Sequence, residues 1–441
     1  MEQIQIQPLK IYQHNNNLEI VEKAGLTLIG LGILGFAVSL TGMGNNTPLL
    51  FFLLSFGLTS IGALTFILPK LKTSPAGVKN NNIFFNTFTS RKTAAWILGI
   101  FITGFYIILY WFPETLTNWI KLVDPLSYWL RNQKADRWFL YGTFYTFAVL
   151  IMGTRMLIKK RHNKYHIIRT LSVMFFQLGF AFLIPALLLR LNQPEHYFTY
   201  FWPLHYYDLF PGSVDSLLKN GNIGYFMVFW GAIMTFIATP ILSYFYGKRW
   251  YCSWVCGCGG LAETAGDPFR QLSDKSVKAW KLERWLIYSV LVFITLTTIL
   301  VWLNFVYHGE LLGNVSSVFS QVYGFLIGAM FSGVIGVGFY PLLGNRVWCR
   351  FGCPMAAILG ILQKKKSKFR ITTNGDQCIS CGNCSTYCEM GIDVRSYAQR
   401  GENIVRASCV GCGICSEVCP RGVLKLENDF TDVRTNFNIL N

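Results

Sequence analysis

The sequence predicts an all-α polytopic membrane protein of about eight transmembrane helices, followed by a small α+β domain at the C-terminus. Of its 441 residues, 52% are apolar and only 14% are charged, and the mean hydropathy is +0.37. An ordinary soluble domain carries roughly 25% charged residues, so this composition excludes a cytosolic or secreted enzyme as the main body. All 13 cysteines lie between Cys252 and Cys419, which favours cofactor ligands in one half of the molecule over scattered disulfides.

Eight stretches are apolar enough, over about 20 residues, to cross a bilayer as helices. The first follows a polar tail and no small-residue cleavage site comes after it, so a cleaved signal peptide is not expected. It also contains glycines at the spacing of a dinucleotide fingerprint (Gly30, Gly32 and Gly35), which helix packing explains within a span. The expected spans are 25–43, 48–68, 93–112, 138–158, 170–189, 225–245, 285–304 and 323–343.

The distribution of basic residues predicts a cytoplasmic N-terminus in a bacterial inner membrane. Excess Lys and Arg on the cytoplasmic side is the orientation signal of membrane proteins. The net charge of +17 is therefore explained by topology and by contact with the lipid bilayer, and nucleic acid is not expected as a partner. With this orientation only six of the 39 basic residues lie outside: Lys121, Arg131, Lys134, Arg137, Arg190 and Lys219.

Five units are expected along the chain. They are a cytoplasmic tail (1–24), five spans without a recognised motif (25–224), a duplicated helical hairpin region (225–368), a cysteine-rich cytoplasmic domain (369–430) and a C-terminal tail (431–441).

The cysteine-rich domain contains the bacterial ferredoxin pattern twice. Each run has three cysteines separated by two residues and a fourth cysteine after three more residues. In two-cluster ferredoxins, the fourth cysteine of each run binds the cluster of the other run. The spacing therefore predicts an α+β bacterial ferredoxin domain with two [4Fe–4S] clusters. The expected ligands are Cys378, Cys381, Cys384 and Cys419 for one cluster, and Cys409, Cys412, Cys415 and Cys388 for the other.

Zinc is the alternative metal for such a cysteine-rich domain. Zinc sites generally use two pairs of Cys or His, and two complete four-cysteine runs in tandem fit that arrangement poorly. Glu389 departs from the ferredoxin pattern, because it follows Cys388 where proline is common. It is expected to alter the local turn or the potential without removing a ligand.

The other five cysteines, the membrane-face cysteines, come directly after the sixth and eighth predicted spans. The segments 247–256 and 344–353 align as Gly-x-Arg-x-x-Cys-x3-Cys at an offset of 97 residues, which indicates a duplicated hairpin. A gap of three residues would place both thiols of a pair on one helix face. The membrane-face cysteines are Cys252, Cys256, Cys258, Cys349 and Cys353.

The two aligned pairs are expected to hold one further metal centre, such as an iron–sulfur cluster. Arg249 and Arg346 would offset the negative charge of its thiolates. Cys258 would either replace Cys256 or remain free. The alternative is that all five thiols are structural or redox-active without a metal.

Together these motifs resemble the membrane polyferredoxin family. The resemblance covers roughly Tyr225 to Leu426. Members include the membrane iron–sulfur subunit of periplasmic nitrate reductase systems, the nitrous oxide reductase regulator and a cytochrome oxidase assembly protein that handles copper. The family pattern has Cys-Pro after each pair; Cys353-Pro354 conforms, whereas Cys256-Gly257 departs from it. The resemblance implies electron transfer between quinol, or a membrane partner, and the clusters.

A diffusing quinone, or a partner subunit, is expected to carry electrons through the bilayer. No predicted span contains a histidine pair for b-type haem, and no Cys-x-x-Cys-His motif occurs. His205 and Asp208 form the best polar cluster for a quinone headgroup and its protons. The many Trp and Tyr residues of segment 190–224 favour the alternative, an aromatic belt at the membrane surface.

The sequence thus predicts a membrane-bound iron–sulfur electron-transfer protein, expected as a subunit of a membrane oxidoreductase. It would link a quinone pool, a redox protein or a membrane complex to clusters on the cytoplasmic side. The alternative is an assembly factor that reduces or handles copper for a respiratory oxidase, because soft thiolates favour Cu(I). A transporter with a redox-sensing tail fits the sequence less well, since charged residues are expected within the spans of an ion-coupled transporter and these spans contain almost none.

Overall fold

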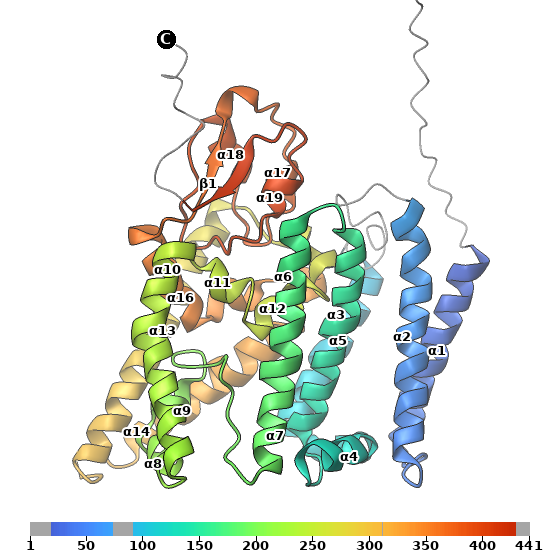
Figure 1. Ribbon diagram of the computed structural model, residues 1–441, viewed down its shortest axis with the longest axis vertical. Helices are drawn as coiled ribbons and strands as arrows, with labels where there is room; N and C mark the ends of the chain where they lie inside the picture. Colours follow the sequence, from blue (N-terminus) through green and yellow to red (C-terminus); the bar gives the residue numbers. More distant parts are fainter. Residues whose placement is uncertain (1–18, 74–90, 311, 429–441) are drawn as a thin grey trace, which may run out of the picture.

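The computed structural model describes residues 19–73, 91–310 and 312–428 and confirms a mostly helical chain. Among these residues, eight helices are long and apolar enough to cross a membrane, as predicted. They run side by side in Figure 1, and the small C-terminal domain lies at one end of the bundle. The predicted tails before residue 19 and after residue 430, and the loop 74–90, lie outside the described residues.

Five of the spans are single helices and three contain a π-helical segment. π-helical turns are rare and are frequently found at functional sites. The single helices are α1 (Ile20–Ser39), α2 (Pro48–Thr73), α3 (Thr93–Trp111), α5 (Arg137–Lys159) and α13 (Val277–Val306). The composite spans are α6 (Lys164–Phe175), η3 (Phe176–Leu183) and α7 (Ile184–Arg190); α9 (Asn222–Ile233), η5 (Met234–Ala238) and α10 (Thr239–Tyr246); and α14 (Val315–Tyr323) with η7 (Gly324–Ile335).

Short helices cover both ends of the bundle. The end opposite the C-terminal domain carries α4 (Thr117–Arg131) and α8 (Pro211–Leu218). Along the chain, η2 (Pro113–Leu116) precedes α4 and η4 (Tyr206–Leu209) precedes α8. The end beneath that domain, here called the junction layer, carries α11 (Arg249–Cys252), α12 (Gly257–Glu263), η6 (Asp267–Leu272), α15 (Tyr340–Leu343), η8 (Trp348–Gly352) and α16 (Pro354–Lys366).

Among its described residues, the C-terminal domain contains a two-stranded antiparallel sheet. Strands β1 (Arg370–Thr373) and β2 (Leu424–Glu427) pair with Arg370 opposite Glu427. Between them lie η9 (Gly375–Gln377), α17 (Asn383–Thr386), α18 (Val394–Gln399) and α19 (Ile414–Glu417). One buried apolar cluster includes Phe369 and Val410 of this domain together with Tyr251 and Met355 of the junction layer. The domain therefore shares a core with the membrane domain.

The eighth span ends at Ile335, well before the predicted end at residue 343. The chain turns at Gly336 and Gly338, where neighbouring groups leave no room for side chains. A Cβ at Gly338 would lie 3.1 Å from the Cα of Thr103, and one at Gly336 would lie 2.9 Å from the Cβ of Trp348. The close approach of α3 and the junction layer therefore ends the span early.

Helices α1 and α2 form a closely packed pair. A Cβ on Gly25 would lie 2.9 Å from the carbonyl oxygen of Gly62, and a Cβ on Gly32 would lie 2.6 Å from that of Ser55. Small residues allow transmembrane helices to approach this closely. Helix packing therefore accounts for Gly32 in the fingerprint-like sequence of α1.

We predict that Gly62→Val separates α1 from α2. A Cβ at position 62 would lie 2.7 Å from the amide nitrogen of Ile29, which is backbone and cannot rotate away. We expect a loss of about 2 kcal/mol or more in stability, measured by thermal unfolding in detergent. Gly57→Val is the matched control, because nothing lies within 4 Å of its Cβ position. Equal melting of the two variants would contradict this packing.

Candidate functional site

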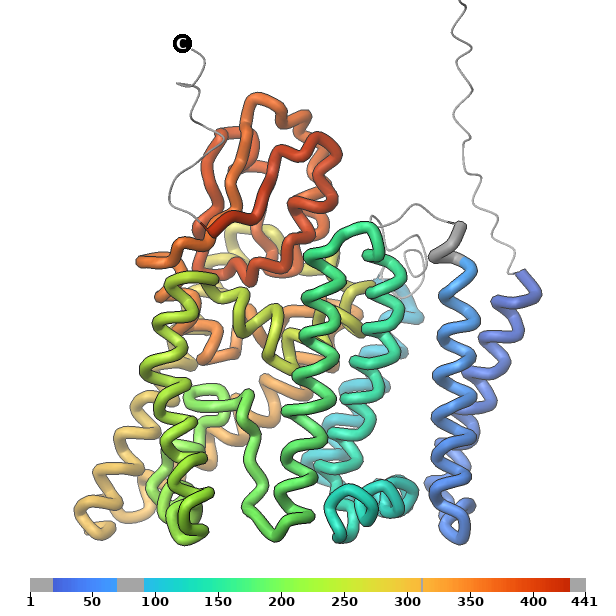
Figure 2. The backbone as a smooth tube through the Cα atoms, viewed as in Figure 1, coloured from blue at the N-terminus to red at the C-terminus, as the bar shows by residue number. Residues whose placement is uncertain are grey.

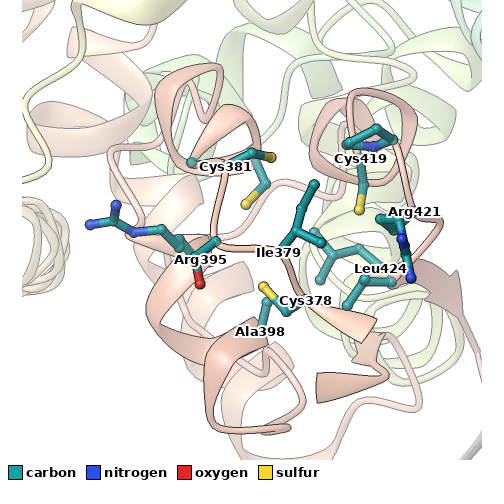
Figure 3. A pocket seen from close by; sticks show the side chains of 13 residues that line it. Cys378, Ile379, Cys381, Arg395, Ala398, Cys419, Arg421 and Leu424 are labelled. Atoms are coloured by element: carbon teal, nitrogen blue, oxygen red, sulfur yellow. The ribbon is translucent and has the colours of Figure 1, made fainter. Parts of the chain in front are cut away.

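The first four predicted cluster ligands surround a small cavity in the C-terminal domain. Cys378, Cys381, Cys384 and Cys419 all line it, and Figure 3 shows Cys378, Cys381 and Cys419 around it on different sides. Burial, with added repulsion from nearby Cys419, Cys381 and Cys378, raises the pKa of the Cys384 thiol to about 11. The structure therefore groups the same four cysteines as the sequence pattern.

The other four predicted ligands are also close together. Burial raises the pKa of the Cys415 thiol well above its ordinary value, and nearby Cys412, Cys409 and Cys388 raise it further. Cys388 is the fourth cysteine of the first run but lies beside the cysteines of the second run. Cys419, the fourth cysteine of the second run, lies beside those of the first run. This exchange is the arrangement that the ferredoxin spacing predicts.

The loop 409–412 is bound to the membrane domain through four consecutive carbonyl oxygens. The oxygens of residues 409, 410, 411 and 412 accept hydrogen bonds from Gln363 Nε2 (2.8 Å), Ser253 Oγ (2.7 Å), Tyr165 Oη (2.8 Å) and Arg169 Nη1 (2.5 Å) respectively. Each donor belongs to a span or to the junction layer. Within the same loop the amide of Gly411 hydrogen-bonds the thiol of Cys409. Hydrogen bonds of this kind to cluster sulfurs tune the potential.

The four cysteines of the aligned pairs lie together in the junction layer. Each is buried, with 5–6% of its surface exposed. Burial raises the pKa of Cys353 well above its ordinary value, and nearby Cys349, Cys252 and Cys256 raise it further. Within the described residues, no three His, Cys, Asp or Glu side chains are grouped as a site for a single ion.

The expectation that each pair shares one helix face is wrong. Cys252 ends α11, whereas Cys256 precedes α12; Cys349 lies in η8, whereas Cys353 precedes α16. A break separates the members of each pair, and its geometry is the same in both motifs. The amide of Cys256 donates to the carbonyl of Tyr251 (2.9 Å), and the amide of Cys353 donates to that of Trp348 (3.0 Å).

Arg346 lies beside these cysteines as predicted, but Arg249 does not. Arg346 Nη1 is 3.8 Å from Cys349 Sγ and donates to the carbonyl of Cys252 (3.2 Å). The guanidinium of Arg249 stacks instead on the ring of Phe369, 4.9 Å from its centroid. Lys248, which is 1% exposed, supplies the second positive charge, because both Lys248 and Arg346 oppose the effect of burial on the pKa of Cys252.

Cys258 lies close to other membrane-face cysteines and also lines a large cavity. Its thiol hydrogen-bonds that of Cys256 and thereby lowers the pKa of Cys256 to about 7. A Cβ on Gly257 would lie 2.3 Å from the hydroxyl of Tyr200, which lines the same cavity. Gly257, which stands where the family pattern has proline, therefore leaves space for the hydroxyl of Tyr200.

The cavity has a volume of about 670 Å³ and extends through the membrane domain. One end is polar and includes Glu195, His205 and Tyr207, while the other end includes Cys258 and Pro354 of the junction layer. Its middle is lined by apolar side chains and by the π-helical segments η3 and η7. Four tyrosines line the cavity: Tyr110, Tyr141 and Tyr145 come from spans, and Tyr200 comes from segment 190–224. None of them was predicted as a site residue, because tyrosines in apolar spans and at membrane surfaces are usually packing residues.

The aromatic segment between α7 and α8 is not simply a surface belt. Figure 2 shows this green stretch rising from the end opposite the C-terminal domain into the interior. The hydroxyl of Tyr251 donates to the carbonyl of Thr199 (2.7 Å), and Trp202 Nε1 donates to Thr298 Oγ1 (3.1 Å). Irregular backbone at this depth is tolerated when it is buried in protein or lines a cavity.

The polar cluster predicted in this segment is present. His205 Nδ1 is 2.6 Å from Asp208 Oδ1, and His205 Nε2 is 2.5 Å from the hydroxyl of Tyr207. His205 and Tyr207 both line the cavity. The two imidazole nitrogens therefore connect a cavity hydroxyl to a carboxylate.

Glu389, the departure from the ferredoxin pattern, is completely buried at the junction. Its carboxylate pairs with Arg270 and lies 3.0 Å from Arg346 Nη2, and its carbonyl accepts from Ser273 Oγ (2.7 Å). Glu263 lies in the same network. Although burial opposes ionisation, Arg169, Arg270 and Arg346 lower the pKa of Glu263 to about 2. Glu263 therefore remains charged among these arginines, and the ion pairs of Glu389 with Arg270 and Arg346 connect the C-terminal domain to the junction layer.

Two iron–sulfur families match parts of the chain. A 4Fe-4S dicluster domain matches residues 377–424, which contain the eight cysteines of the C-terminal domain. A 4Fe-4S binding domain matches residues 228–276 and 325–372, which contain the membrane-face cysteines. The second of these matches begins 97 residues after the first, the same offset as the aligned motifs.

Two curated relatives are similar to part of the chain. YccM of Escherichia coli (strain K12), provisionally described as an electron transport protein, is 28% identical over 179 residues, 38% of this chain and 48% of YccM. The ferredoxin-type protein NapH of the same organism is 26% identical over 174 residues, 39% of this chain and 56% of NapH. The chain thus spans about half the length of these relatives. No solved structure matches it. These findings support the predicted resemblance to membrane polyferredoxins.

We predict that Glu389→Gln loosens the C-terminal domain. The substitution leaves Arg270 and Arg346 short of a buried negative charge, which costs about 3 kcal/mol or more. We expect faster proteolysis of the C-terminal domain and a lower melting temperature. Glu402→Gln is the matched control, because Glu402 pairs with Arg400 on the exposed surface of the same domain. Equal protease resistance of both variants would contradict the role of Glu389.

Proposed function

Because the chain is a homologue of ferredoxin-type proteins, we propose that it transfers single electrons between a quinol in the membrane domain and two [4Fe–4S] clusters in the C-terminal domain. One observation carries this proposal. A cavity within the spans ends beside membrane-face thiols, and the layer holding those thiols also binds the cysteine loop 409–412. When bound, iron–sulfur clusters accept and release single electrons.

The cluster ligands follow from the two cysteine groups. Cys378, Cys381, Cys384 and Cys419 would hold the outer cluster, and Cys409, Cys412, Cys415 and Cys388 the cluster nearer the membrane domain. The crossed grouping of Cys388 and Cys419, the match to a 4Fe-4S dicluster domain and the engaged carbonyls of loop 409–412 support this assignment. We likewise propose that the ferredoxin domain spans residues 369–430 and follows the duplicated hairpin region 225–368.

The membrane-face set supplies the donors for one further centre. Cys252, Cys256, Cys349 and Cys353 provide four thiols, and Arg346 and Lys248 supply positive charge beside them. A match to a 4Fe-4S binding domain over both segments supports an iron–sulfur centre here. We do not assign Cys258 as a ligand of this centre. It lines the cavity and contacts Cys256, so it would lie between the cavity and the centre.

The large cavity suits a quinol in size and in polarity. Ligand cavities commonly measure 300–1,000 Å³ and combine apolar walls with a few polar groups. Oxidation of one quinol releases two electrons and two protons. The electrons would leave one at a time past Cys258, toward the thiols of the junction layer. The protons would pass to the hydroxyl of Tyr207 and on to His205, whose second nitrogen is held by Asp208.

The outer cysteine group would exchange electrons with a redox partner. Cys381 is exposed, and the neighbouring Ile379 exposes 56% of its surface beside the same cavity. Electron-transfer encounters need only a small contact area. The excess of basic residues at this end of the bundle supports placing the domain in the cytoplasm, with the spans in a bacterial inner membrane.

We predict that Cys353→Ser removes the further centre and leaves the two ferredoxin clusters. The side chain of Cys353 accepts from the amide of Ala356 at the start of α16, and serine serves the same capping role, so the fold is retained. We expect about four fewer iron atoms per chain, measured by iron and sulfide analysis after anaerobic purification.

Cys258→Ser is the matched control for this substitution and should retain all the iron. Unchanged iron in Cys353→Ser would contradict the centre. Copper binding that depends on the membrane-face cysteines, with both ferredoxin clusters intact, would instead favour the copper-handling function.

We predict that Gly328→Leu blocks quinol oxidation. Gly328 lines the cavity, and its Cβ position lies 3.7 Å from the ring of Tyr206, so a leucine would extend into the open space. In stopped-flow absorbance, we expect cluster reduction by decylubiquinol to slow at least tenfold, while reduction by dithionite is unchanged.

Gly231→Leu is the control in another span, because its Cβ position has no neighbour within 4 Å and it does not line the cavity. If Gly328→Leu kept the normal rate with quinol, the cavity would not be the quinol site. Loss of reduction by dithionite as well would show damage to the clusters.

A further inference from the structure

We propose that a second pocket, on the other side of the junction layer, binds the phosphate group of an anionic phospholipid. This cationic pocket has a volume of about 200 Å³ and lies between α13, α16 and the loop 405–408 of the C-terminal domain. Five basic side chains line it: Lys248, Arg284, Arg350, Lys364 and Arg406.

The charge of this pocket is strongly positive. Glu283 is its one acidic lining residue, and that carboxylate is already engaged. It lies 2.6 Å from Arg350 Nε and accepts a hydrogen bond from Ser408 Oγ (2.5 Å). Lys248 and Arg350 are buried, with 1% and 3% of their surface exposed. Glu283 is paired with Arg350, and Lys248 lies near the Cys252 thiol. Arg284, Lys364 and Arg406 have no carboxylate partner in the described part of the chain and favour an anionic ligand.

Arg350 has a donor with no partner among the described residues. Its Nε binds Glu283 and its Nη1 donates to the carbonyl of Asp274 (2.7 Å), but its buried Nη2 makes no hydrogen bond. An unmade hydrogen bond from a buried charged group is expensive. A phosphate oxygen would satisfy it, because guanidinium donors match phosphate oxygens in geometry and charge.

The mouth of the pocket is arranged for a headgroup. Arg284 and Lys364 are exposed and Arg406 is half-buried. The guanidinium groups of Arg406 and Arg284 both lie against the ring of Trp280, at 4.8 and 5.3 Å from its centroid. Stacking on one ring restrains both side chains before a ligand binds.

The position of the cationic pocket beside the start of α13 indicates that the phosphate belongs to a lipid. Next to Arg284, the apolar side chains of Leu282 and Trp285 expose 51% and 68% of their surfaces. Exposed Trp beside Arg at the start of a span marks the depth of lipid headgroups. Basic pockets between transmembrane helices on the cytoplasmic side bind anionic headgroups. The exposed apolar surface of α13 would then lie along the acyl chains.

This pocket is distinct from the redox cavities. Of the 13 cysteines only Cys349 lines it, and it shares no lining residue with the quinol cavity. Lipid binding can therefore be tested independently of electron transfer.

The test is native mass spectrometry of the full chain, delipidated in detergent and then mixed with phosphatidylglycerol or phosphatidylcholine. We expect the wild type to retain phosphatidylglycerol in preference to phosphatidylcholine. The double variant Arg284→Gln/Arg406→Gln should bind phosphatidylglycerol at least tenfold more weakly. Both residues are at the mouth, so the fold should be preserved, which circular dichroism would verify.

Lys278→Gln/Lys365→Gln is the matched control. Both lysines are exposed, on the helices α13 and α16 that border the pocket, but neither lines it, so lipid binding should be unchanged. Equal retention of phosphatidylglycerol by the pocket variant and the control would overturn the proposal. Binding of inorganic phosphate without any preference for phosphatidylglycerol would also overturn it, because the ligand would then be a soluble phosphate.

Discussion

The hydrogen bonds from the membrane domain to the carbonyl oxygens of residues 409–412 are the interaction on which the redox site depends. They attach a cysteine loop directly to spans and junction helices, through donors that are fixed in their own elements. The buried carboxylate of Glu389 adds ionic contacts between the C-terminal domain and the junction arginines Arg270 and Arg346. A ferredoxin on a flexible linker would sample many distances from the membrane, whereas this one is held at a single distance.

The junction layer explains why so much charge is buried beneath the C-terminal domain. Its arginines pair with Glu263 and Glu389, and one of them, Arg346, also lies beside a membrane-face thiol. Charged groups of this kind are costly to bury unless they are paired. They are retained here where two groups of cysteines meet, and they offer positive charge to both. Packing, domain docking and cofactor electrostatics therefore use the same residues.

The parts of this structure that follow local rules could be predicted from the sequence. Eight spans follow from apolar runs, and the crossed cysteine groups follow from two spacings that exclude most other arrangements. The end of the eighth span could not be predicted, because Gly336 and Gly338 turn the chain only in response to neighbours distant in sequence. The sequence also could not show that Lys248, rather than Arg249, supplies positive charge beside the membrane-face cysteines, because the two residues are adjacent and both basic. The cavity was not predicted, because its tyrosines come from separate spans and from the segment between α7 and α8 and show no periodic signal.

The cavity explains why the irregular segment between α7 and α8 enters the membrane domain. A chain that leaves the membrane surface and returns must satisfy its backbone groups, and here Tyr251 and other side chains supply partners. In return, the segment brings a histidine and a tyrosine to one end of an apolar space whose other end reaches a thiol. Protons and electrons from one donor would therefore leave in different directions.

The most direct test of this account is Mössbauer and electron paramagnetic resonance spectroscopy of the anaerobically purified full chain. The account predicts [4Fe–4S] signals from at least two clusters, with magnetic interaction between them after full reduction because the two cysteine groups adjoin. Zinc in place of iron, or only mononuclear iron, would contradict it.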